Sequence, residues 1–130
     1  MSRLLLDTHV WLWMVADPGR LSPEARDELA DMDNTLLFSA ASGWEIAVKH
    51  GLGKLILPSA PRDYVPDRLR RSGVLPLAVE LDHVLRVSEL PPHHRDPFDR
   101  LLVAQAQALD LRLVTADSQL DAYDVDLLRT

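Results

Sequence analysis

Two short apolar runs, near opposite ends of the chain, each lead directly to an aspartate, and this pattern restricts the possible folds. Leu4–Leu6 is followed by Asp7, and Leu111–Thr115 is followed, after one alanine, by Asp117. Mostly apolar runs of this length are typical of strands that are buried on both faces of a parallel sheet. If both runs are such strands, their carboxyl ends lie at one edge of the sheet, where open α/β sheets place their ligand sites.

The rest of the chain alternates between strand-like and helix-like segments that are joined by short connections. Predicted strands cover residues 4–6, 35–38, 74–79, 111–115 and 125–128, and predicted helices cover 10–16, 22–31, 39–50, 62–72, 82–90, 97–109 and one turn at 118–122. Strands that alternate with helices favour a parallel sheet with helices on both faces and right-handed crossovers. We therefore predict a single three-layer α/β domain over residues 1–130, with a central parallel sheet of about five strands.

Two of these helices carry more detailed predictions. In the third, the apolar residues Trp44, Ala47 and Val48 are predicted to face the interior, and Gly51 is predicted to end the helix. The fourth is basic and amphipathic, and it contains Pro66. Because an interior proline removes a backbone hydrogen bond, the sequence leaves open whether this segment forms one helix or two.

The composition is that of an ordinary globular protein, and it excludes several kinds of metal site and of protein. Hydrophobic residues make up 47% of the chain and charged residues 26%, and no apolar run approaches the ~20 residues that cross a bilayer. Because the sequence has no recognisable secretory signal, we expect a cytoplasmic protein without a membrane anchor. Cysteine is absent, which excludes disulfides and thiolate metal ligands. The net charge of −6 argues against a bulk nucleic-acid binder, although basic residues cluster at 49–54, 62–71 and 93–100.

Four carboxylates are predicted to converge at the ligand-binding edge of the sheet. Asp7 and Asp117 follow two of the strands, while Glu45 and Asp99 lie near the starts of two predicted helices. Carboxylates a few ångströms apart repel one another or trap a proton unless a cation neutralises them. An all-oxygen ligand set suits Mg²⁺ or Mn²⁺. The pattern therefore predicts a divalent-metal site.

Each acidic residue also has an ordinary structural role that the sequence leaves open. Asp7 and Asp117 are placed to cap the helices that follow them, and Asp96 precedes a proline, which is a favourable N-cap position. Glu45 is placed to pair with Lys49 one helical turn later. The prediction of a metal site thus rests on the combination of the acids rather than on any one of them.

The histidines offer a weaker alternative. His93 and His94 are adjacent, so their side chains point in different directions, and neither has a partner at the spacing of a zinc site. We predict that both lie at the rim of the site, near the substrate. His9, two residues after Asp7, is a candidate contact for phosphate.

Taken with their neighbours, the four acids resemble those of the PIN-domain ribonucleases and, among these, of the VapC toxins of bacterial toxin–antitoxin pairs. The resemblance covers the chain from near its first residue to near its last. The matching segments are Leu4-Leu5-Leu6-Asp7-Thr8-His9, Ser42-Gly43-Trp44-Glu45-Ile46-Ala47, Asp96-Pro97-Phe98-Asp99-Arg100-Leu101-Leu102-Val103-Ala104-Gln105-Ala106 and Leu113-Val114-Thr115-Ala116-Asp117. Each segment alone is a weak signal, but all four in this order are specific.

The resemblance implies a metal-dependent endoribonuclease that hydrolyses RNA phosphodiester bonds, for example in transfer RNA, with one or two Mg²⁺ or Mn²⁺ ions. The implied metal-binding and catalytic residues are Asp7, Glu45, Asp99 and Asp117. Thr115 is expected to orient a carboxylate or a metal-bound water, and Asp96 to support the site as a cap or through water. The candidate contacts for RNA are His9, Lys49, Arg95 and Arg100.

The resemblance also implies partners. VapC-like proteins are commonly homodimers that are inhibited by a small VapB-like antitoxin, which places a basic residue among the acids. The apolar stripe at residues 11–14 is either a surface for such partners or part of the core. The alternative functions are a PIN scaffold that binds metal without turnover and a receiver-like regulatory module that binds Mg²⁺. A phosphatase with an aspartyl nucleophile is disfavoured, because His9 stands where a second acid is needed.

Overall fold

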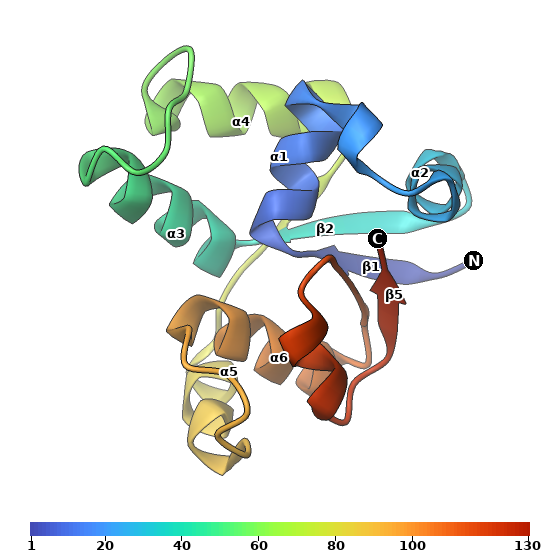
Figure 1. Ribbon diagram of the computed structural model, residues 1–130, viewed down its shortest axis with the longest axis vertical. Helices are drawn as coiled ribbons and strands as arrows, with labels where there is room; N and C mark the ends of the chain where they lie inside the picture. Colours follow the sequence, from blue (N-terminus) through green and yellow to red (C-terminus); the bar gives the residue numbers. More distant parts are fainter.

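A five-stranded parallel sheet forms the centre of the computed structural model, which describes residues 1–130 (Figure 1). The strands are β1 (Arg3–Leu6), β2 (Thr35–Ser39), β3 (Leu75–Leu77), β4 (Arg112–Thr115) and β5 (Leu127–Arg129). They lie in the order β3-β2-β1-β4-β5, and every neighbouring pair is parallel. β1 is therefore the central strand, and it is hydrogen-bonded to β2 on one side and to β4 on the other. The predicted parallel sheet of about five strands is confirmed.

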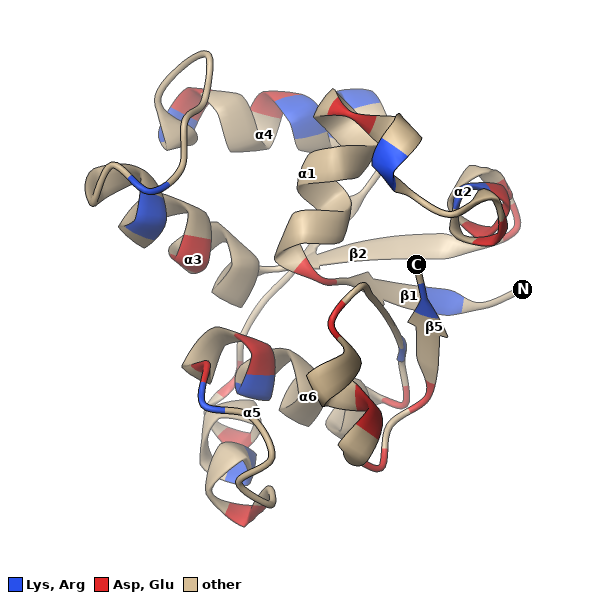
Figure 2. Ribbon diagram, in the orientation of Figure 1, with Lys and Arg blue, Asp and Glu red and all other residues tan.

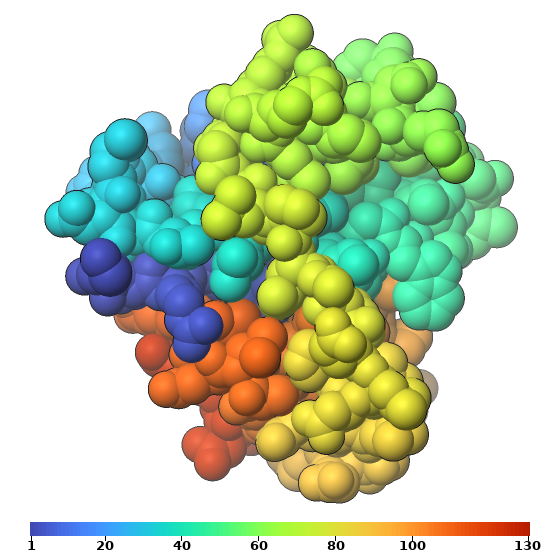
Figure 3. Space-filling model, turned by 180° about the vertical axis from the view of Figure 1, so that it is seen from behind, coloured from blue at the N-terminus to red at the C-terminus, as the bar shows by residue number.

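Helices cover both faces of this sheet. They are α1 (Thr8–Ala16), α2 (Pro23–Ala30), α3 (Ala40–Gly51), α4 (Pro61–Ser72), α5 (Leu81–Arg86) and α6 (Pro97–Leu109), with 3-10 turns at Pro18–Arg20, Val87–Glu89 and Ser118–Ala122. In Figure 1, α1, α2 and α4 lie on one side of the sheet and α5 and α6 on the other. The chain crosses between these layers at the β3 edge, where the segment from α4 to α5 runs over the back of the molecule (Figure 3). No helix combines the length and the apolarity needed to cross a membrane.

The alternation of side chains along β1 builds two hydrophobic cores. Leu4 and Leu6 pack in the core that includes Trp11, while Leu5 packs in the core on the opposite face. Trp11 is completely buried, and residues 12–15 are partly buried against the same core. The apolar stripe of α1 therefore packs mainly against the interior.

The predicted interior face of α3 is wrong. Trp44 is 58% exposed and Ala47 is exposed, whereas Ser42, Glu45 and Ile46 are buried. The prediction assumed that the apolar side of the helix faces the interior. This part of the interior is instead lined by polar groups, so a serine and a glutamate point inward and a tryptophan points outward.

The proline and glycine positions also differ from expectation. α4 continues without a break through Pro66. Pro66 lies in the second turn, so its ring removes only one hydrogen bond near the start of the helix. α3 continues through Gly51 and is capped at Leu52, and it is Gly53 that has the positive φ, of 72°. The other boundaries shift by a few residues: the predicted strand 74–79 shortens to Leu75–Leu77, and the predicted helix 82–90 forms α5 and a 3-10 turn.

Candidate metal centre

Four carboxylates gather at the carboxyl edge of the sheet, beside the central strand. Asp7 follows β1, Asp117 follows β4, Glu45 lies on α3, and Asp99 lies in the first turn of α6. Figure 2 shows acidic segments on these four elements around a common space. Asp7, Glu45 and Asp99 are buried, with exposures of 4%, 2% and 9%, whereas Asp117 is half-buried. We call these four residues the acidic cluster.

Asp7 is held by one hydrogen bond and retains one unpaired oxygen. Thr115 Oγ1 donates to Asp7 Oδ2 over 2.7 Å, while Asp7 Oδ1 is buried without a partner. Although Asp7 occupies the N-cap position of α1, its side chain makes no capping bond. Burial raises the pKa of Asp7, and the bond from Thr115 only partly opposes this rise. Because this oxygen is buried and accepts no hydrogen bond from the helix, it is free to bind a cation.

Glu45 is held from both sides. Thr8 Oγ1 donates to Glu45 Oε1 over 2.6 Å, and Lys49 Nζ forms an ion pair with Glu45 Oε2. Thr8 Oγ1 also lies 2.8 Å from Ser42 Oγ, so two buried hydroxyls support this carboxylate. Burial lowers the pKa of Lys49, but the hydrogen bond and charge of Glu45 outweigh it and raise the pKa overall. The pairing with Lys49 that the sequence allowed is therefore present, and Glu45 is buried at the same time.

Asp99 shows the electrostatic cost of the cluster most clearly. Its pKa is raised to about 8, first by burial and then by the negative charges of Asp7, Asp96, Glu45 and Asp117. Without a cation, this carboxylate therefore retains a proton near neutral pH. A divalent cation bound here would offset the neighbouring negative charges, which are the second cause of the raised pKa.

Asp117 is less buried than the other three acids, and both of its oxygens are already engaged. The backbone N–H of Gln119 donates to Oδ1 over 2.9 Å, and His94 Nε2 lies 2.7 Å from Oδ2. Burial alone raises the pKa of Asp117, but these two bonds and the nearby charges of His94 and Arg129 lower it overall. The predicted capping role of Asp117 is thus present, and it leaves Asp117 less free than Asp7 to bind a cation directly.

His94 lies inside the cluster, although sequence reasoning placed it at the rim. Its side chain is 11% exposed, and Nε2 lies 2.7 Å from Asp117 Oδ2 and 3.3 Å from Asp99 Oδ2. The N–H of Asp96 donates to His94 Nδ1 over 2.9 Å, so a neutral ring carries its proton on Nε2. His94 is therefore a hydrogen-bond donor to the acids in this arrangement. Its neighbour His93 is exposed and packs against Tyr123 instead.

The predicted supporting residues connect these groups. The Thr115 hydroxyl that donates to Asp7 also accepts a hydrogen bond from the N–H of Asp117 over 3.0 Å. Asp96 caps α6, since its Oδ1 accepts from the N–H of Phe98 over 2.8 Å and from the N–H of Asp99 over 3.4 Å. Asp96 therefore fixes the turn on which Asp99 is presented.

The four candidate RNA contacts have different surroundings. His9 and Arg95 are exposed, and Lys49 is partly exposed beside Glu45. The guanidinium of Arg100 instead donates to the carbonyls of residues 87, 90, 91 and 94 and to the hydroxyl of Tyr123. Arg100 thus holds the loop before α6 in place, and its contact with RNA stays a prediction.

The residues present fit a divalent cation. The donors are carboxylate oxygens, one of which is buried and unpaired, and the raised pKa of Asp99 reflects its burial beside other negative charges. Hard oxygen ligands of this kind suit Mg²⁺ or Mn²⁺. His94, Asp99 and Asp117 place one ligand atom each within 4.8 Å of the others. Because Nε2 of His94 already lies within hydrogen-bond distance of Asp117, a cation in this cluster would bind the carboxylate oxygens rather than this ring.

Comparison with known proteins identifies the family. The chain matches the model of the PIN domain over residues 4–126. Ribonuclease VapC22 of Mycobacterium tuberculosis is 32% identical over 126 residues, which are 95% of this chain and 93% of that protein. Ribonuclease VapC16 of the same organism is 50% identical over 60 residues, which are 46% of this chain and 43% of that protein, so this match spans less than half the length of VapC16.

Solved structures agree with this fold. VapBC2 from Rickettsia felis, bound to a DNA fragment of its promoter, has a TM-score of 0.72 at 18% identity, with 98% of each chain covered. DNA-bound VapBC from Salmonella typhimurium has a TM-score of 0.72 at 13% identity, with 99% of this chain and 98% of that chain covered. At these identities the likeness establishes the fold alone. With the domain match and the similarity to VapC22, it follows that the chain belongs to the PIN-domain family and, within it, to the VapC group.

Proposed function

We propose that this protein is a metal-dependent endoribonuclease and the toxin of a toxin–antitoxin pair. The observation that carries the proposal is the acidic cluster, with an unpaired buried oxygen on Asp7 and a pKa of about 8 for Asp99. Burying like charges together is costly unless a cation is bound, so an acidic cluster of this kind is a candidate for function rather than for stability. The similarity to proteins named ribonucleases supports RNA as the substrate.

Asp7, Glu45 and Asp99 would hold Mg²⁺ or Mn²⁺, and Asp117 would support the site. When bound, the cation lowers the pKa of a coordinated water and offsets the negative charge that develops on the phosphate. The protein orients each ligand through a hydroxyl or a ring: Thr115 for Asp7, Thr8 for Glu45 and His94 for Asp117. No side chain of the cluster needs to act as a nucleophile.

Basic side chains at the rim of the acidic cluster would contact the phosphates of the RNA backbone. Lys49 lies beside Glu45, and Arg95 is exposed in the loop before α6. His9 is exposed and lies two residues after Asp7. Together with the bound cation, these groups would reverse the local sign of an otherwise acidic surface and attract phosphates. We propose a structured RNA, for example transfer RNA, as the substrate.

The proposed partner is a VapB-like antitoxin, since the structural neighbours include VapBC complexes. A basic side chain of such a partner would enter the acidic cluster and bind where the cation binds, which would block activity by charge complementarity. We also propose a homodimer. A PIN scaffold without turnover and a receiver-like module are less favoured, because all four acids are present and the chain is a PIN domain.

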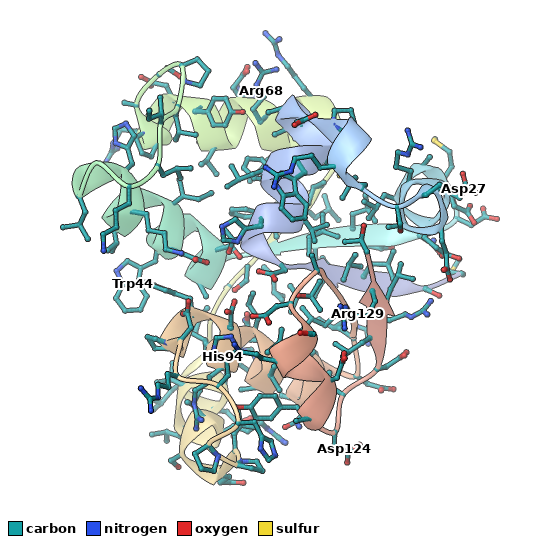
Figure 4. The ribbon with its side chains drawn as sticks, in the orientation of Figure 1. Asp27, Trp44, Arg68, His94, Asp124 and Arg129 are labelled. Carbon is teal, nitrogen blue, oxygen red and sulfur yellow. The ribbon has the colours of Figure 1, made fainter.

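The test is cleavage of end-labelled total RNA by the purified chain, with Mg²⁺ or Mn²⁺ and with EDTA. Asp7→Asn is compared with Asp27→Asn, which changes an exposed aspartate on the distant helix α2 (Figure 4). We expect discrete products that require metal, vanish in the Asp7 variant and persist in the Asp27 variant. Absence of cleavage by the folded wild type with either metal would reject a ribonuclease and favour a binding scaffold.

A further inference from the structure

A tryptophan and a phenylalanine lie next to the acidic cluster, on the two helices that carry Glu45 and Asp99. Trp44 precedes Glu45 on α3, and Phe98 precedes Asp99 on α6. Their rings pack edge to face, with centroids 4.8 Å apart and planes at 74°. Figure 4 shows Trp44 at the outer end of the space between α3 and α6, with His94 on the α6 side of that space.

The exposure of Trp44 is not explained by packing. Of the three tryptophans, Trp11 is fully buried and Trp13 is partly buried against the core, whereas Trp44 remains 58% exposed despite its contact with Phe98. Exposing a large aromatic ring to water forgoes the stabilisation that its burial would bring. Other exposed apolar residues, such as Leu52 and Ile56, are aliphatic and cannot stack on a planar ligand.

The position of Trp44 is well fixed. It lies on α3 between the buried residues Ser42 and Glu45, and its partner Phe98 belongs to a turn whose N–H groups are capped by Asp96. A ring that is already held in place loses little conformational entropy when a second planar group stacks on it. Trp44 is thus a rigid and accessible aromatic surface next to the acids.

We infer that Trp44, supported by Phe98, stacks on an unpaired nucleobase of the RNA next to the phosphodiester that is cleaved. This inference rests on the proposed ribonuclease function, because a phosphate held at the acidic cluster brings its neighbouring bases close to Trp44. Stacking on aromatic side chains is a common way in which proteins bind the bases of single-stranded RNA. Lys49, the next cation along α3, is close to Glu45 and would contact the adjoining phosphate. A positive charge for the phosphate and an aromatic ring for the base therefore lie on the same helix, and single-stranded RNA offers a partner for each.

The test determines whether Trp44 contacts one particular base of the RNA. Binding is measured by fluorescence anisotropy with a labelled single-stranded RNA oligonucleotide of mixed sequence, in the Asp7→Asn background so that the RNA is not cut. A set of oligonucleotides in which each base in turn is removed, leaving the abasic ribose, identifies the base that contributes. We expect one abasic position to weaken binding by roughly five- to a hundredfold, which is the range for one base stacked on an aromatic ring.

Adding Trp44→Ala should weaken binding of the intact RNA by a similar factor. In that variant, removing the identified base should cause no further loss of affinity. Trp44→Phe should restore the affinity for intact RNA and its sensitivity to removal of that base. Leu52→Ala, at an exposed apolar residue at the far end of α3, is the matched control and should change neither. An unchanged abasic profile in Trp44→Ala would overturn the inference, as would loss of binding to a VapB-like antitoxin with RNA binding intact. If the wild type neither binds nor cleaves RNA, it is the proposed function that fails.

Discussion

The protein has two buried polar clusters close to the carboxyl ends of its strands, and only one of them is fully satisfied. In the neutral cluster, the Ser39 hydroxyl donates to Gln105, whose Nε2 lies 3.2 Å from the carbonyl of Ala78 and 3.3 Å from Nδ1 of His83. The N–H of Glu80 also donates to this Nδ1 over 3.0 Å. We call Ser39, His83 and Gln105 the neutral cluster. None of its side chains is a carboxylate.

The acidic cluster has the opposite character. One oxygen of Asp7 has no partner, and the pKa of Asp99 is raised to about 8 because the carboxyl group is buried and its neighbours carry like charges. Both clusters are buried, so burial of polar groups does not by itself distinguish structure from function. The two clusters differ in whether their polar atoms have partners: the paired neutral network joins elements together, whereas the unpaired charged one is a candidate cation site.

The largest effect is expected from Asp99→Asn, which removes a charge from the acidic cluster with little change in shape. RNA cleavage should fall roughly a thousandfold or more, because a bound metal contributes several kcal/mol of charge stabilisation. In EDTA above the pKa of Asp99, the thermal midpoint should rise, since the variant no longer buries an unfavourable carboxylate. Single-turnover cleavage and calorimetry measure the two changes. A loss of both activity and stability would instead assign Asp99 a structural role.

A smaller effect is expected from His94→Ala. Because His94 Nε2 donates to Asp117 and approaches Asp99, its loss should reduce Mn²⁺ affinity or cleavage by about 10- to 100-fold, the range for groups that orient metal ligands. His93→Ala is the matched control, since His93 contacts only Tyr123 among aromatic rings and is exposed. If nitrogen coupling appeared in the electron spin-echo spectrum of bound Mn²⁺ and vanished in His94→Ala, His94 would be a ligand rather than an orienting donor.

The acidic cluster should also make metal affinity depend on pH. A raised folded-state pKa means that the metal-free fold binds a proton that the unfolded chain has already lost, so its stability in EDTA should fall as pH rises from about 4 to about 8. Cation binding displaces this proton, so Mn²⁺ affinity should increase about tenfold per pH unit and level off above about pH 8. Titration calorimetry in two buffers of different ionisation enthalpy would detect the released proton. Affinity that is independent of pH would contradict the assignment.

The smallest effect on cleavage is expected in the neutral cluster. Gln105→Leu should leave cleavage by the folded protein unchanged while lowering the free energy of unfolding by about 1–3 kcal/mol, because Ser39 and the Ala78 carbonyl each lose a partner. Urea unfolding gives the stability, and cleavage is normalised to the folded fraction. A specific loss of activity without a loss of stability would show that the two clusters are not functionally distinct.

The elements that local patterns determine could be predicted from the sequence. The apolar run of β1 and the helix start at Ser22 are local signals, and both predicted elements are present. Asp7 and Asp117 could be placed at one edge because parallel strands share their direction. Glu45 and Asp99 could be assigned to this edge only from their positions near the starts of two predicted helices, which the resemblance to a known family then reinforced, since no local rule brings α3 and α6 together.

The remaining features depend on contacts between distant residues. The inward face of α3 was misassigned because hydrophobic periodicity assumes an apolar interior, whereas Glu45 and Ser42 face a polar one. His94 could not be placed, because its position depends on a loop that Arg100 holds through backbone carbonyls. Thr8, which donates to Glu45, was overlooked for the same reason, since the two residues meet only in the folded chain.

The central claim is that the acidic cluster is a site for a divalent cation, and its most direct test is Mn²⁺ binding followed by electron paramagnetic resonance. The wild type should remove free Mn²⁺ from solution, and Asp7→Asn, which neutralises the carboxylate with the unpaired oxygen, should bind at least about tenfold more weakly while remaining folded. Equal binding by the two proteins, or no binding by the wild type, would contradict the claim.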